Sequence, residues 1–149
     1  MAIPALRITH TLGQEPNPEA RLADIGADIA AGNLIPFLGP ELLGLEEEPK
    51  VPVTPEALAM ELRAKVPVGA MLRGNMWGTA QFIEQRRHRK TLVAIMADIF
   101  KTPVKPGALH LWLARQKIPL IVDTWYDGAL AQAFKDAGVD PASVTQVAL

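Results

Sequence analysis

The chain of 149 residues contains no cysteine, so it forms no disulfide, no thiolate nucleophile and no cysteine-ligated zinc or iron–sulfur centre. Histidine is almost as scarce, because His10, His88 and His110 are the only three and no ligand spacing joins them. No apolar run approaches the roughly 20 residues that span a bilayer. The start, MAIPALRITHTLGQEP, lacks the charged region and apolar core of a signal peptide. We therefore expect a cytoplasmic protein without a membrane partner.

A strong charge of one sign is also lacking, because the formal net charge is only -1. Such a chain has no general electrostatic field that attracts nucleic acid. Its one basic run, residues 86–90, has no interleaved aromatic residues and is interpreted as an exposed helix face or turn. A salt-sensitive contact with an acidic protein surface is the alternative for this run. No nucleic-acid partner is expected.

What the chain does contain is an alternation of helical and strand patterns, with 49% hydrophobic residues available to form a core. Asn17 and Pro18 are typical of a helix start, and Thr54 and Pro55 repeat that pattern. The apolar segment 34–38 predicts a buried strand between these two helices. The later expected elements are a helix over about residues 79–100 with a break near 86–90, a helix at 108–116, a strand at 118–122, a helix around 130–137 and a terminal strand at 144–149.

Strands separated by helices predict a parallel sheet with right-handed crossovers. We expect an α/β, Rossmann-like fold in which a short, mostly parallel sheet of about three to four strands is flanked by helices. Residues 1–16 are expected to form an N-terminal arm, and residues 17–149 a single domain with a mostly helical insert at about 54–101. Ligands of such sheets bind beyond the carboxyl ends of the strands, so the loops at 39–44 and 123–127 should be neighbours.

Two segments carry a resemblance to a known family. IPFLGPELL, from residue 35, and HLWLARQKIPLIVDTWYDGALAQAF, from residue 110, resemble the GAGxS loop and the TTNYD segment of the sirtuin-like family in order and spacing. The resemblance covers roughly residues 18–138. It implies a Rossmann-like fold, NAD as ligand, and deacylation or NAD hydrolysis as chemistry. It also implies that any cofactor-binding residues would be Gly39, Thr124, Tyr126 and Asp127.

The family's chemistry is incomplete in this sequence. Pro40 has no N–H for a phosphate, and Glu41 stands where the family has a glycine. A carboxylate about 4 Å from a phosphate would weaken binding by roughly 1 to 4 kcal/mol. Trp125 replaces the family's asparagine, and no histidine follows His110, although the family's catalytic histidine lies on a later segment. We therefore assign no catalytic residue and expect no cofactor, with NAD as the alternative.

Structural roles compete with ligand roles at the remaining polar positions. Asp127 is interpreted as a cap of the helix that follows it, and His110 as a packing or capping residue of its own helix. Glu41 and Asp123, a conceivable pair for a hard divalent cation, are interpreted as solvated side chains. No metal site is expected.

The segment 66–78 combines glycines, a proline, methionines and a tryptophan, and is predicted to be an irregular loop. Met71, Leu72, Met76 and Trp77 are its candidate partner-binding residues, since flexible methionines and a tryptophan suit a partner's groove. The alternative is a lid folded over the domain's own core.

A noncatalytic, protein-binding accessory factor is the function that these features favour, and a divergent NAD-binding or NAD-hydrolysing enzyme is the alternative. A weaker resemblance, carried by the size and overall appearance of the chain, is to the short sirtuin-like proteins encoded among nitrogen-fixation genes of bacteria. That resemblance implies a nitrogenase component as the protein partner, and a protective or assisting role for this chain.

Overall fold

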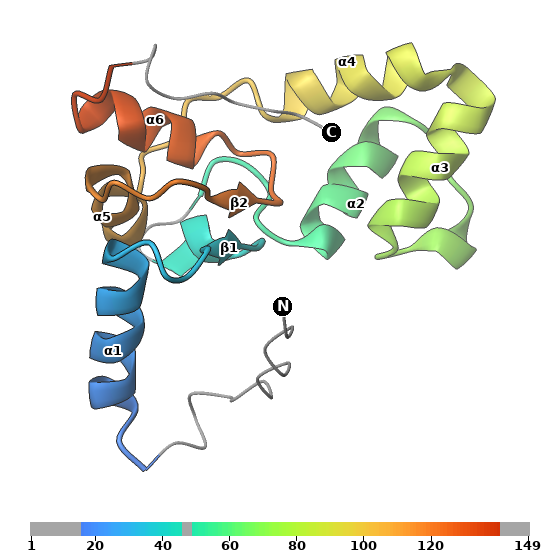
Figure 1. Cartoon of the computed structure of the whole chain (residues 1–149). Coiled ribbons are helices and arrows are strands. Elements are labelled where there is room, and N and C mark those ends of the chain that lie inside the picture. The colour runs from blue at the N-terminus through green and yellow to red at the C-terminus, as the bar shows by residue number, and fades with distance from the viewer. Residues whose placement is uncertain (1–15, 46–48, 141–149) are drawn as a thin grey trace, which may run out of the picture.

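A computed structural model describes residues 16–45 and 49–140 of the chain. Within these ranges the protein is mostly helical, with six α-helices and a small two-stranded sheet (Figure 1). The predicted terminal strand at 144–149 and nearly all of the predicted arm at 1–16 lie outside the described residues. The elements are α1 (Pro18–Ala30), β1 (Phe37–Leu38), a 3₁₀ helix (Leu42–Leu45), α2 (Pro55–Lys65), a 3₁₀ helix (Ala70–Leu72), α3 (Met76–Arg87), α4 (Arg89–Ile99), α5 (Ala108–Arg115), β2 (Val122–Asp123) and α6 (Ala129–Asp136).

The sheet is parallel, as expected, but among the described residues it has two strands, fewer than the three to four expected from the sequence. Phe37 lies opposite Val122 and Leu38 opposite Asp123, so each strand has two residues. Prolines explain the short ladder, because Pro36 and Pro119 stand within the apolar segments that predicted longer strands and have no N–H to donate. Pro36, directly before β1, still takes part in the pairing, because its carbonyl accepts from the backbone N–H of Val122 at 2.9 Å.

Side-chain caps start the first two helices where the sequence predicted them. The side-chain oxygen of Asn17 accepts from the backbone N–H of Ala20 at 3.1 Å, and Pro18 occupies the first turn of α1. The hydroxyl of Thr54 accepts from the N–H of Ala57 at 3.1 Å at the start of α2. Each side chain satisfies a backbone donor that the helix leaves unpaired.

The structure differs from the predicted loop at 66–78, because α3 already begins at Met76. The side-chain oxygen of Asn75 accepts from the N–H of Gly78 at 2.8 Å, and this cap starts the helix despite the glycine. The predicted break near 86–90 is confirmed. His88 separates α3 from α4 with a φ of 69°, in the left-handed region that ends a right-handed helix.

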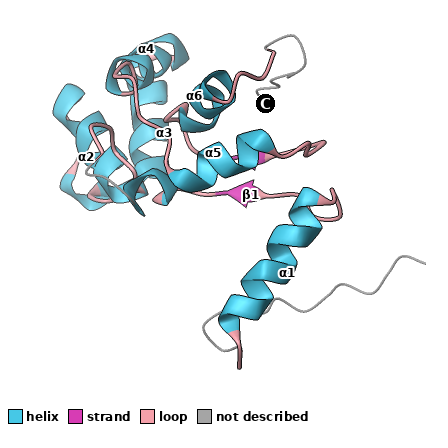
Figure 2. Cartoon of the chain, turned by 90° about the vertical axis from the view of Figure 1, so that its left-hand side faces the viewer, coloured by secondary structure: helices cyan, strands magenta, loops and turns pink. Residues whose placement is uncertain are grey.

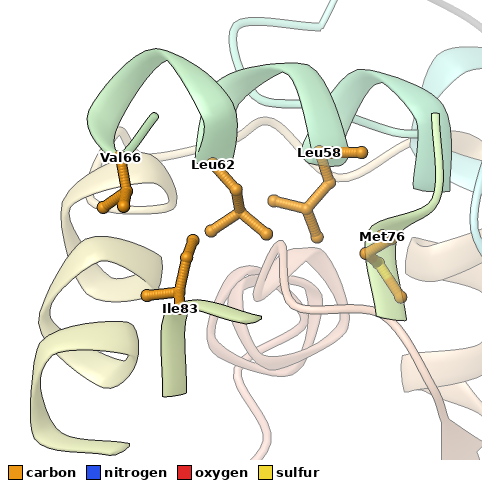
Figure 3. Packing of buried hydrophobic residues seen from close by; sticks show 6 residues of the cluster. Leu58, Leu62, Val66, Met76 and Ile83 are labelled. Atoms are coloured by element: carbon orange, nitrogen blue, oxygen red, sulfur yellow. The ribbon is translucent and has the colours of Figure 1, made fainter. Parts of the chain in front are cut away.

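The largest core lies among α2, α3 and α4, which we call the helical lobe. Leu58 and Leu62 of α2, and Val66 directly after it, point toward Ile83 and Met76 of α3 (Figure 3). Of these, Leu58, Leu62 and Ile83 have no exposed surface (0%). The helical lobe lies within the region expected to be a helical insert, and it contains the larger of the two clusters of buried apolar residues in the described ranges.

The other elements, α1, β1, β2, α5 and α6, form what we call the sheet lobe. A smaller cluster of Leu43, Val51 and Ala129 lies here, and Phe100 packs against both this cluster and the larger core. Helix α1 buries none of its residues and projects away from the rest of the molecule in both views (Figures 1 and 2). No helix in the described ranges combines the length and hydropathy needed to cross a bilayer.

Candidate functional site

The loops that follow β1 and β2 lie side by side at the carboxyl ends of the strands, as the sequence predicted. The backbone N–H of Thr124 donates to the carbonyl of Leu38 at 3.1 Å, and the Thr124 hydroxyl donates to the same oxygen at 2.8 Å. Thr124, a candidate cofactor residue, therefore uses its hydroxyl to join the second loop to the end of β1.

The first loop turns tightly after Gly39. Glu41 has a φ of 73°, a left-handed conformation that favours glycine. Its N–H donates to the carbonyl of Val53 at 2.7 Å, and its own carbonyl accepts from the N–H of Gly44 at 2.9 Å. Pro40 has no N–H to offer. A phosphate loop would present backbone N–H groups at these two positions. Here Pro40 has no N–H, and the N–H of Glu41 is already bonded to Val53.

In the second loop, Asp127 caps the helix that follows it. Its Oδ1 accepts from the backbone N–H of Ala129 at 2.8 Å, in the first turn of α6, and the capping interpretation is confirmed. Tyr126 is 46% exposed, and its ring lies 5.7 Å from that of Phe100 and 5.5 Å from that of Trp125, centroid to centroid. The indole N–H of Trp125 donates to the carbonyl of Pro52 at 3.0 Å. The second loop is therefore tied to the segment that leads into α2.

Electrostatics at this edge are modest. Partial burial raises the pKa of the Asp123 carboxyl, and the charge of Asp127 adds to the shift, while the hydrogen bond from the N–H of Trp125 and the charge of His110 oppose it. In the part of the chain that the structure describes, no three acidic or histidine side chains gather where they would hold a metal ion. Glu41 and Asp123 thus have no third ligand there.

His110 has a structural role. It is buried, with 4% of its surface exposed, and its Nδ1 accepts from the backbone N–H of Gly107 at 3.3 Å. This bond satisfies a donor at the start of α5. The interpretation of His110 as a packing and capping residue is confirmed.

An open apolar pocket of about 480 Å³ lies between the lobes. Leu58 and Leu62 of α2 line it together with side chains of α3 and α4, and Tyr126 reaches it from the sheet lobe. Of the described residues that line it, only Arg89 is charged. The volume falls within the range of about 300 to 1,000 Å³ that is typical of ligand sites.

The four candidate partner-binding residues divide between the surface and the interior. Met71 is 96% exposed and Trp77 72% exposed, and Trp77 also lines the pocket. Met76 is 4% exposed and belongs to the core of the helical lobe, whereas Leu72 is half-buried against α3. The structure does not bring the four together as one exposed patch.

Sequence reasoning missed the α4 side of the pocket. Leu92 and Met96 lie in the helix predicted over about residues 79–100, and Arg89 in the basic run at 86–90, but nothing local indicated that they border one opening. The signal that was available was the break near residue 88, because a turn at this point allows residues on both sides of it to line one opening.

The chain matches no protein-family model, no curated protein and no solved structure. The resemblance to the sirtuin-like family therefore rests on the segments quoted in the sequence analysis.

Proposed function

We propose that this chain is a noncatalytic protein-binding accessory factor on a degenerate sirtuin-like, Rossmann-like fold, and that the pocket between the lobes receives the partner. The observation that carries the proposal is the open apolar pocket with Trp77, 72% exposed, at its border. Buried tryptophans are frequent anchors of protein interfaces. A partner that covered this indole would gain on the order of 3 kcal/mol from apolar burial.

The polar groups of the two loops support a noncatalytic role. The N–H of Glu41 is paired with Val53, Asp127 caps α6, and His110 caps α5. The alternative, a divergent NAD-binding or NAD-hydrolysing enzyme, would require the loop after Gly39 to break its pairing with Val53 before its amides met a phosphate. A carboxylate on Glu41 would still oppose that anion.

A capture experiment tests the proposal with a matched pair of variants. Tagged full-length chain should retain one stoichiometric protein from native extract, and the purified partner should bind it in calorimetry. Trp77→Ser should abolish both signals. Phe37→Ser should leave both unchanged, since Phe37 is equally exposed (71%) but lies on the sheet lobe. The weaker resemblance makes a nitrogenase component the first purified partner to test.

Calorimetric titration with NAD and ADP-ribose provides the opposing test. We expect no heat of binding and no release of nicotinamide. Micromolar binding of either nucleotide, or turnover of NAD, would overturn the noncatalytic proposal and favour the enzyme.

A further inference from the structure

The pocket has the outline of a groove along one helix. Arg89, Leu92, Val93, Met96 and Phe100, all on α4 or just after it, border the pocket at spacings of three or four residues. Such spacing marks one face of a helix. From Arg89 to Phe100 this face extends roughly 16 Å, or about three turns. The opening therefore matches a short helix better than it matches a single side chain.

Positive charge is concentrated at one end of the groove. Arg89 lies at one end, beside the exposed side chains of Arg86, Arg87 and Lys90. Among the described residues the only ion pair of this corner joins Arg89 to Glu84 at 3.5 Å. The first turn of α4 has no acidic residue, so the positive end of the helix dipole adds to these cations.

The opposite end of the groove is aromatic. Phe100 and Tyr126 border the pocket there, with ring centroids 5.7 Å apart. An occupant that fits both ends has an apolar face over three turns and negative charge at one end only.

We propose that the groove binds an amphipathic helical segment of a protein partner, with apolar anchors at i, i+3 or i+4 and i+7, and with carboxylates at the end that meets Arg89. This inference rests on the proposed protein-binding function and specifies the chemistry of the partner. Helix-in-groove binding uses this spacing of anchors. The carboxylates would complement the basic corner and set the direction of the bound helix.

Two other anionic partners fit less well. A nucleic acid would satisfy the corner with phosphates, but its polar backbone would leave the apolar groove uncovered. An anionic membrane is flat on this scale, so it would not fill a concave pocket lined by Leu58, Leu62 and Met96.

Fluorescence anisotropy with the full chain tests the inference. The probe is a labelled amphipathic peptide of about 15 residues, with leucines at the stated spacing and three glutamates at one end. A second peptide carries three lysines in place of the glutamates. We expect the acidic peptide to bind at least about tenfold more tightly at low salt. That preference should shrink in 0.5 M salt, at which the screening length is only about 4 Å.

The double variant Arg89→Glu with Lys90→Glu should reverse the preference between the two peptides. Both positions are exposed in the first turn of α4, where carboxylates favour the helix dipole, and circular dichroism checks that the variant is folded. Arg115→Glu with Lys135→Glu, on α5 and α6, is the matched control and should change nothing.

The possible results separate this inference from the proposed function. Equal binding of both peptides, or binding of neither while the natural partner is still captured through Trp77, overturns the helix-with-carboxylates inference and leaves the proposed function standing. Tighter binding to single-stranded DNA or to phosphatidylserine vesicles than to the acidic peptide also overturns it. If the Trp77→Ser variant captures the partner as well as the unchanged chain does, the proposed function itself is overturned.

Discussion

The helical lobe and the sheet lobe differ in the size of the clusters formed by their buried apolar residues. In the helical lobe Leu62 and Ile83 have no exposed surface (0%), whereas Phe37 on β1 is 71% exposed and α1 buries no residue. Parallel sheets are normally covered on both faces. The segment predicted to be an insert therefore contains the larger buried cluster, and the smaller cluster lies in the rest of the described structure.

The largest expected effect tests this difference directly. Leu62→Ala should lower the free energy of unfolding by about 2 to 5 kcal/mol, because it opens a cavity in the core of the helical lobe. Phe37→Ala should lower it by less than about 0.5 kcal/mol, because the ring is mostly in solvent. Urea denaturation followed by circular dichroism measures both. Similar losses for the two variants would contradict the contrast between the lobes.

A smaller effect is expected where the two lobes are joined. Trp125→Phe keeps a ring near Phe100 but removes the indole N–H that donates to the carbonyl of Pro52 at 3.0 Å. We expect a loss of about 1 kcal/mol in unfolding free energy. Hydrogen exchange should show faster exchange near residues 50–53 and 122–127. Unchanged exchange in both segments would show that this bond does not couple the lobes.

Each lobe contains one described non-glycine residue with a left-handed backbone. Removing the steric strain at either residue should stabilise the protein. Glu41 has a φ of 73° in the sheet lobe and His88 a φ of 69° in the helical lobe. We expect Glu41→Gly and His88→Gly each to add about 0.5 to 1 kcal/mol, since glycine lacks the steric penalty but loses more backbone entropy on folding. Thermal unfolding measures the gain. A destabilised Glu41→Gly would indicate that the carboxylate makes a favourable contact.

The smallest expected effect is a pH dependence within the helical lobe. Hydrogen bonds from Lys101 and Lys65, at 2.7 and 2.8 Å, lower the pKa of Asp98 from its usual 3.8 to about 2. A lowered carboxyl pKa stabilises the fold above the unfolded value, and this contribution is lost as pH falls from about 4 toward 2. Asp98→Asn should therefore lower the urea midpoint slightly at pH 7 and have less effect at pH 2.5. An equal effect at both pH values would exclude this linkage.

The sequence predicted best those features that depend on neighbouring residues. The Asn17 and Thr54 caps and the break near His88 are local, and the structure shows all three. The adjacency of the two strand-end loops was also predictable, because parallel strands place their carboxyl ends at one edge.

The remaining features depend on opposing local signals or on contacts between residues far apart in the sequence. The glycines of 66–78 predicted a loop, whereas the cap from Asn75 starts α3 at Met76 in the structure. Apolar runs interrupted by Pro36 and Pro119 predicted longer strands than the ladder allows. The pocket needed three helices at once, and no local pattern indicates that Arg89 and Tyr126 line the same opening.

The left-handed backbone of His88 has a consequence for assembly. Without it, residues 76–99 would continue as one helix of roughly 36 Å, and α4 would no longer fold back beside α3. A helix released in this way can pack in the same place on a second copy, which is how domain-swapped dimers arise from a straightened hinge. We therefore expect that a variant with a straightened corner at residue 88 would exchange α4 between two chains more readily.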